Sequence, residues 1–174
     1  GADVIIALGG GSPLDAGKAI GLMSLNDGNI TDYEKSTPLR PGLPVIAIST
    51  TAGTGSEVTK FVVITDTERK IKMLINSPFL IPHVAILDPR LTLSIPPAFT
   101  AGPGMDALTH AVEGYTCTLA EPITDACGIY AIEMIGANIR EAVSGSAKDA
   151  RSNMLLGSLI AGICFGNSDI AGVH

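Results

Sequence analysis

Hydrophobic residues follow two different patterns along the 174 residues of the chain, one before and one after Ile95. In the first part, short apolar runs are separated by turns rich in glycine, proline and polar residues. Such runs are typical of strands buried in a sheet. The predicted strands cover residues 3–8, 45–49, 61–65, 70–75 and 83–89, and the third and fourth are joined as a hairpin.

At Ile95-Pro96-Pro97 the pattern changes to helical periodicity, which continues to the end of the chain. Helices are predicted over residues 105–115, 122–143 and 147–165, with an irregular approach at residues 102–104 and a further helix beginning at Asn167. We therefore expect an α/β nucleotide-binding domain with a Rossmann-like parallel sheet over residues 1–95. An all-α domain is expected over residues 96–174.

Composition narrows the class of protein. Hydrophobic residues make up 46% of the chain, and 11 lysines and arginines face 17 acidic residues, so a core is expected and a nucleic-acid partner is not. No apolar run approaches the roughly 18 residues that a membrane span needs. Three cysteines without CxxC spacing indicate reduced thiols and a cytoplasmic location. The start Gly1-Ala2-Asp3, without an initiator methionine, suggests a piece of a longer protein.

A glycine-rich loop, Gly9-Gly10-Gly11-Ser12-Pro13, follows the first predicted strand. Ser12 is suited to cap a helix and Pro13 to begin one, so we predict a helix over residues 13–25. Backbone N–H groups at such a helix start favour a phosphate, and the diphosphate of a nucleotide would fit. A tight turn with no ligand is the alternative. Lys18 lies one turn further on and is only a candidate for a phosphate contact.

A second loop of small and hydroxyl residues, 50–57, directly follows the predicted strand 45–49. Ligands in α/β proteins bind beyond the carboxyl ends of strands, so we expect the two loops to line one crevice. An ordinary polar turn is the alternative. Alternation places Lys70 and Lys72 on one face of a later strand, either in solvent or within reach of a ribose.

Asp106 and His110 stand four residues apart in an apolar segment. On a helix, residues at this spacing share a face with Cβ atoms ~5–6 Å apart, so a single cation can bridge them. A plain surface hydrogen bond between them is the alternative. His174 follows apolar residues, and a histidine in such a context is usually a packed core residue or part of a frayed chain terminus.

Together these motifs resemble the iron-containing, or group III, alcohol dehydrogenases. The resemblance spans nearly the whole chain and rests on four motifs in order: Gly9 to Asp15 with Lys18, Ser49 to Thr59, Leu87-Asp88-Pro89 with Ile95-Pro96-Pro97, and Gly104 to Tyr115. It implies a dehydroquinate synthase-like two-domain architecture, truncated here. It also implies a divalent iron in the cleft between the two domains.

The resemblance also implies roles for individual residues. Gly10, Gly11 and Ser12 would hold the diphosphate of NAD or NADP, with Asp15 near the cofactor. Thr50, Thr51, Thr54 and Ser56 would line the ribose and nicotinamide side, and Lys72 would contact a ribose. The metal ligands would be Asp106, His110 and His174, for Fe(II) or for Zn or another divalent metal. A fourth ligand, another histidine, would follow His174.

The implied reaction is a hydride transfer that interconverts an alcohol or diol with its aldehyde or ketone. A small alcohol or aldehyde is the expected substrate, and the full-length form is expected to be a homo-oligomer. Two alternatives stay open at this point: a truncated non-catalytic fragment of such an enzyme, and a dehydroquinate-synthase-like lyase that uses NAD and a metal. The lyase would need basic residues around the cleft for a phosphorylated acidic substrate, and the predicted helical segments offer few besides Arg140 and Arg151.

Overall fold

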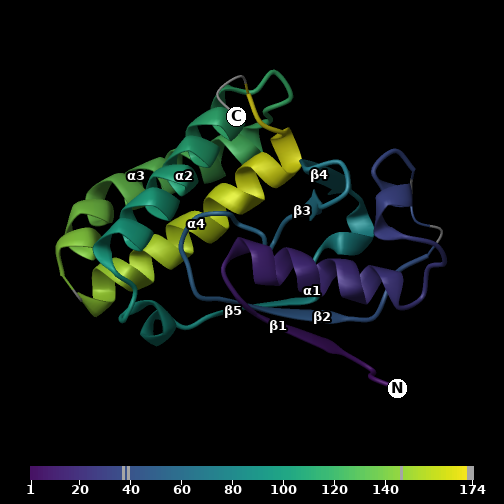
Figure 1. Cartoon of the computed structure of the whole chain (residues 1–174). Helices are drawn as coiled ribbons and strands as arrows, with labels where there is room; N and C mark the ends of the chain where they lie inside the picture. The colour runs from purple at the N-terminus through teal and green to yellow at the C-terminus, as the bar shows by residue number, and fades with distance from the viewer. Residues whose placement is uncertain (37, 39, 146, 172–174) are drawn as a thin grey trace. The chain divides into compact units, whose positions relative to one another are not determined.

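The structure, a computed structural model, describes residues 1–36, 38, 40–145 and 147–171. The chain divides into two compact units (Figure 1). The first comprises residues 1–49 and 56–86, and the second comprises residues 50–55 and 87–174. The domain boundary predicted between residues 95 and 96 stays a prediction.

A three-stranded sheet with the order β1-β2-β5 forms the base of the first unit. Its strands are β1 (Ile5–Gly9), β2 (Val45–Ser49) and β5 (Val84–Leu87). β1 pairs with β2 in parallel, with Ile5 opposite Val45. β2 and β5 lie within the strands expected from the sequence, and β1 ends one residue later than expected, at Gly9. Each strand is rich in β-branched and aliphatic residues.

Helix α1 (Gly11–Met23) covers one face of this sheet (Figure 1). Leu14 packs on Ala7, Val45 and Ala47, and all four side chains are buried. Gly17 faces Ala7 so closely that an added Cβ would lie 2.5 Å from the Ala7 Cβ. Small residues on both elements therefore set the distance between helix and sheet.

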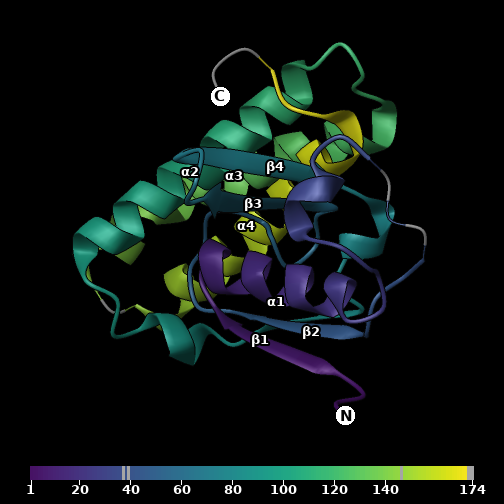
Figure 2. The same ribbon diagram turned by 45° about the vertical axis from the view of Figure 1, so that its right-hand side comes forward.

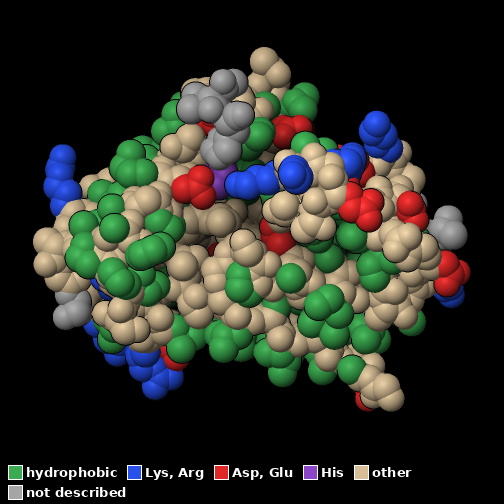
Figure 3. Space-filling view, viewed as in Figure 1, with side chains coloured by type: hydrophobic (Ala, Val, Ile, Leu, Met, Phe, Trp, Pro, Cys, Tyr) green, Lys and Arg blue, Asp and Glu red, His purple; other side chains and the backbone are tan. Residues whose placement is uncertain are grey.

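The other face of the sheet carries large apolar side chains that remain exposed within the described residues. Ile6 is 64% exposed, Leu8 56%, Val84 46% and Ile86 42%. Hydrophobic side chains also reach the surface over the helices of the second unit (Figure 3). Parallel sheets usually bury both faces, and this sheet buries one.

An antiparallel hairpin completes the first unit. β3 (Phe61–Asp66) pairs with β4 (Ile71–Asn76), as predicted. Val62, Met73 and Ile75 are buried with Leu22 and Leu80 in a second small core. Lys70 lies outside the strand at φ +55°, because it belongs to the turn, so it does not share a strand face with Lys72.

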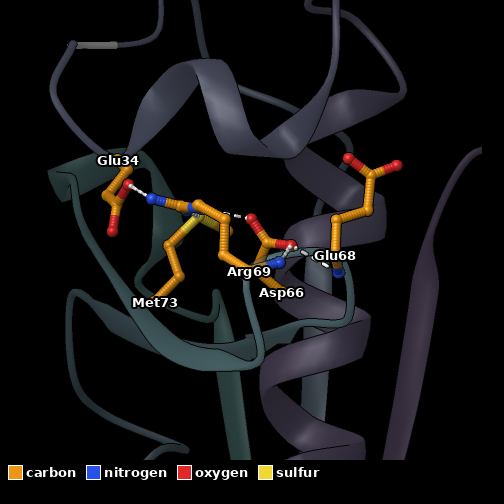
Figure 4. A network of polar contacts seen from close by, with 5 residues as sticks. All are labelled: Glu34, Asp66, Glu68, Arg69 and Met73. Carbon is orange, nitrogen blue, oxygen red and sulfur yellow. Dashed lines mark hydrogen bonds and ion pairs between the residues drawn. The ribbon is translucent and has the colours of Figure 1, made fainter.

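Arg69 fixes the turn of this hairpin (Figure 4). Its guanidinium donates to the carboxylates of Asp66 and Glu34, and a further N–H lies 3.5 Å from the Met73 sulfur. The hydrogen bonds from Arg69 lower the pKa of the Asp66 carboxyl below its usual value. Glu34 follows the 3₁₀ helix Ile30–Tyr33, so this network ties the segment after α1 to the hairpin.

Three α-helices make up most of the described part of the second unit (Figure 2). They are α2 (Pro97–Thr116), α3 (Pro122–Ser144) and α4 (Lys148–Ser168). Their shared core is rich in alanine, with Ile135 and Met154 as its large members. Small core residues allow helix axes to approach closely. None of the helices in the described part of the chain is long and apolar enough to cross a membrane.

A buried arginine attaches the segment before α2 to this bundle. Arg151 of α4 donates to the carbonyl of Thr92, 2.8 Å away, and to the hydroxyl of Thr100, 2.7 Å away. Thr92 ends the 3₁₀ helix Pro89–Thr92, and Thr100 lies in the first turn of α2. Burial lowers the pKa of the Arg151 guanidinium.

Two predictions about helix starts were wrong. Helix α1 begins at Gly11, with Gly10 at the N-cap and no side-chain cap, so Ser12 and Pro13 lie inside the helix instead of at its cap and first position. Helix α2 runs through residues 102–104, which were expected to be irregular. Pro103 has no N–H to donate to the Phe99 carbonyl, but packing of α2 on its neighbours outweighs that loss.

The expected helix beginning at Asn167 was also wrong for the described residues. Helix α4 continues to Ser168, and Asp169 ends it with a φ of +82°. The Ser168 hydroxyl donates to the Cys164 carbonyl one turn earlier. The Cys117 thiol contacts the Ser168 carbonyl at 3.1 Å, which holds this helix end against the bundle.

Candidate cofactor and metal sites

The N-terminus of α1 is the candidate phosphate site. Gly11 and Ser12 occupy its first two positions, where backbone N–H groups have no carbonyl partner within the helix. No acidic residue lies in this first turn to compete with an anion, and Ser12 is exposed. The dipole of a 13-residue helix adds positive potential at the same point.

Gly9 shapes the turn that leads into this helix. Its φ is +149°, and an added Cβ would lie 2.6 Å from the Pro13 Cγ. Only glycine satisfies both the backbone angle and the close contact with the ring. Gly9 is therefore required by the turn itself, which leads through Gly10 into the first helical residues, Gly11 and Ser12.

Asp15 and Lys18 of α1 form a buried polar cluster with the segment that follows the second loop. The Lys18 ammonium donates to the carbonyls of Ser56 and Phe61, at 2.9 and 2.6 Å, and to the Ser56 hydroxyl at 3.2 Å. Asp15 accepts from the Ser56 hydroxyl at 2.5 Å and from the Val63 N–H at 2.8 Å. Lys18 therefore has a structural role here, and not the phosphate contact considered from the sequence.

Burial shifts two ionisable groups in this cluster. Desolvation lowers the pKa of Lys18 from 10.5 to about 8, against the opposing attraction of Asp15 and Glu57. Desolvation also raises the pKa of the buried Glu57 carboxyl. Both shifts favour the neutral form of a group removed from water. The cluster holds the residues after Gly55 firmly on α1.

The loop of residues 50–55 belongs to the second unit, where glycine allows it to approach the helices closely. An added Cβ at Gly53 would lie 2.7 Å from the Pro103 Cβ of α2. Gly55 has a φ of +61°, and a Cβ there would lie 2.7 Å from the Gly162 Cα of α4. Thr50, Thr51 and Thr54, the predicted ribose and nicotinamide contacts, are half-buried in this loop.

The predicted metal pair lies on one face of α2. The His110 Nδ1 is 3.9 Å from the Asp106 Oδ2, and the side chains are 11% and 38% exposed. The imidazole also contacts the Gly53 carbonyl through Nδ1 at 3.3 Å and stacks on the Phe165 ring with centroids 4.3 Å apart. The structure thus brings Asp106 and His110 together as the spacing predicts.

The remaining predicted site residues lie apart from this pair. His174 lies outside the described residues, and within the described ranges no three histidine, cysteine or acidic side chains gather as a metal cluster. Lys72 is exposed on β4. Ser56 and Asp15 are buried and bonded to each other in the first unit.

Sequence reasoning did not find the contacts of Phe165 and Gly53 with His110. Phe165 is one apolar residue among many in a helical segment, and Gly53 lies 57 residues before His110. Nothing in the local pattern distinguishes them. The only available signal was the glycine content of residues 53–55, which indicates close backbone approach without naming the partner.

Comparisons with known proteins identify the family of this chain. The model of the family described as iron-containing alcohol dehydrogenase matches residues 1–89. The model described as Fe-containing alcohol dehydrogenase family, C-terminal, matches residues 100–174. The chain belongs to the iron-containing alcohol dehydrogenase family, which confirms the resemblance seen in its motifs and the predicted fold class.

Similar proteins include dehydrogenases and a reductase. A 1,3-propanediol dehydrogenase of Klebsiella pneumoniae is 47% identical over 99% of this chain and 45% of that protein. An alcohol dehydrogenase from Oenococcus oeni is 42% identical, with a TM-score of 0.95 over 100% of this chain and 46% of that one. A sulfoacetaldehyde reductase from Bifidobacterium kashiwanohense, solved with NAD+, is 39% identical, with a TM-score of 0.93 over 98% of this chain and 46% of that one. The chain thus spans less than half the length of these relatives.

Proposed function

We propose that a full-length protein containing this chain is an NAD(P)-dependent, iron-activated alcohol dehydrogenase. It interconverts a small alcohol or diol with the corresponding aldehyde or ketone. The observation that carries the proposal is the Asp106 and His110 pair on one face of α2, in a chain of this family. Support also comes from the similarity of the chain to the 1,3-propanediol dehydrogenase and to the sulfoacetaldehyde reductase solved with NAD+.

The residues fit both implied groups. A carboxylate and an imidazole form a mixed oxygen and nitrogen donor set, which suits Fe(II), Zn or Mn. His174 would be the third proposed ligand, and the resemblance implies a further histidine after it. The N–H groups of Gly11 and Ser12 at the start of α1 fit a diphosphate, and Gly10 at the N-cap is a further proposed contact. Asp15, Thr50, Thr51, Thr54, Ser56 and Lys72 remain proposed cofactor contacts.

When bound, the metal would supply a Lewis acid for the substrate oxygen, and the nicotinamide cofactor would supply the acceptor for a hydride. The contribution of the chain is positioning. Asp106 and His110 would hold the metal on one face of α2, and the N-terminus of α1 would hold the diphosphate. Residues 50–55 are held on α2 by the contact between Gly53 and Pro103. Each bound group would thus be oriented by its own unit, which lowers the entropic cost of orienting that group.

The test is anaerobic NAD- or NADP-linked oxidation of a panel of short alcohols and diols by iron-loaded, full-length protein. Reduced nicotinamide is followed by its absorbance. Activity that disappears on chelation and returns with Fe(II) is expected. If no alcohol or diol in the panel reduces either cofactor while metal binds, the dehydrogenase proposal fails.

The proposal extends to location and assembly. The three free cysteines, Cys117, Cys127 and Cys164, suit a reducing compartment, so a cytoplasmic location is proposed.

A homo-oligomer is proposed for the full-length form. Exposed apolar side chains such as Ile123, 77% exposed, and Leu119, 63% exposed, support further packing partners. Light scattering of the full-length protein measures its mass, and a monomer would contradict the homo-oligomer.

A further inference from the structure

We propose that Gly53 and Phe165 are positioning residues for the metal ligand His110. The Gly53 carbonyl keeps the imidazole proton on Nδ1, and the Phe165 ring fixes the plane of the imidazole, so that Nε2 carries the lone pair that binds a divalent cation. The inference rests on the proposed metal site. Its evidence comes entirely from contacts inside the second unit.

The hydrogen bond of His110 selects one tautomer. A backbone carbonyl can only accept, so the 3.3 Å contact between Nδ1 and the Gly53 oxygen requires the proton on Nδ1. In a neutral imidazole the lone pair then lies on Nε2. Histidines that bind metals commonly donate their other N–H to a carbonyl or carboxylate in this way, which fixes the tautomer and the ring orientation.

Phe165 limits rotation of the same ring. Its centroid lies 4.3 Å from that of His110, with 19° between the planes, and its side chain is buried. Gly114, one turn after His110, allows this contact: a Cβ there would lie 3.0 Å from the Phe165 N and 3.1 Å from its Cα. Glycine on α2 therefore brings α4 close enough for the two rings to stack.

Glycine also brings the acceptor to the ring. Gly53 approaches the backbone of Pro103 so closely that a Cβ would lie 3.0 Å from the Pro103 Cα and 3.0 Å from its carbonyl oxygen. These backbone atoms cannot rotate away as a flexible side chain can. An alanine at this position must therefore displace the loop from α2, and the carbonyl moves with it.

The test uses four variants of the full-length protein. Gly53→Ala displaces the acceptor, and Phe165→Leu keeps an apolar side chain but removes the stacked ring. Gly102→Ala and Phe99→Leu are matched controls on α2, since a Cβ at Gly102 meets nothing within 4 Å and Phe99 is 69% exposed. Circular dichroism checks folding, and Phe165→Leu remains informative if Gly53→Ala does not fold.

Two measurements separate positioning from activity. In metal-free protein, ¹⁵N NMR of labelled histidine, with His110→Gln used to assign the signal, should show His110 protonated at Nδ1. The Gly53→Ala variant should lose this preference. Competition with a chelator, with Zn²⁺ as the probe, should show about 10- to 100-fold weaker binding in both variants and unchanged binding in both controls.

The proposal is overturned if His110 in the metal-free wild type carries its proton on Nε2. It is also overturned if both variants fold and bind Zn²⁺ as tightly as the wild type. A wild type that binds neither Zn²⁺ nor Fe(II) sinks the proposed function instead. In that case the NMR result still decides whether Gly53 sets the tautomer.

Discussion

Lys18 offers the sharpest prediction, because its charge lies in the interior of the first unit. The side chain is fully buried, and its ammonium donates to three oxygen acceptors. Replacing it in Lys18→Met keeps an unbranched apolar stem but removes the titratable group. The variant should therefore change the way in which the free energy of unfolding depends on pH.

The size and sign of this effect follow from the pKa of Lys18. The folded chain releases the proton near pH 8, whereas the unfolded chain holds it up to 10.5. Between these values the unfolded state binds more protons, so the free energy of unfolding rises with pH. The rise from this residue is ~3 kcal/mol in total. It is complete above the unfolded pKa and is lost as pH falls through about 8.

Urea denaturation followed by circular dichroism, at intervals from pH 7 to 11, measures this dependence in the wild type and in Lys18→Met. The difference between the two proteins reports Lys18 together with its coupling to Asp15 and Glu57, since all other groups are common to both. Lys72→Met, at an exposed lysine of β4, is the matched control and should run parallel to the wild type. If Lys18→Met also runs parallel to the wild type from pH 8 to 10.5, the burial argument is wrong.

Three further predictions follow. Asp106→Ala should abolish metal retention in the full-length protein, whereas the control Met105→Ala, at the exposed neighbouring residue, should retain the metal. Elemental analysis measures the bound metal and an activity assay measures turnover. Stoichiometric metal and normal turnover in Asp106→Ala would disprove the ligand assignment. Gly9→Ala should cost about 1–3 kcal/mol in urea denaturation through its positive φ, and Gly136→Ala, in open space, should cost less than Gly9→Ala. Burial raises the pKa of Cys164 from 9.0 to about 11, so stability should fall as pH rises between these values and Cys164→Ala should lack that fall. Equal denaturation profiles for Cys164→Ala and wild type would contradict this assignment.

Much of the fold could be read from local patterns. Strands β1 and β2 are continuous apolar runs, and α3 begins at Pro122 as predicted and ends at Ser144, one residue after its predicted end. Periodicity fails at the ends of elements, where one or two hydrogen bonds decide. Helix α1 begins before Pro13 and α4 ends after Phe165 for this reason. Propensity also fails at Pro103, where packing of α2 outweighs a lost hydrogen bond.

The candidate site also has features that local sequence patterns predict and features that only the tertiary structure shows. The sequence by itself determined the family, the glycine turn before α1 and the Asp106 and His110 pair, because each is read from motifs whose residues stand a few positions apart. Only the tertiary structure decided that Lys18 is buried against Ser56, 38 residues away, and that His110 meets the Gly53 carbonyl, 57 residues away. Spacing along a helix specifies a shared face, but burial and the partner of an imidazole N–H depend on which distant backbone packs against it.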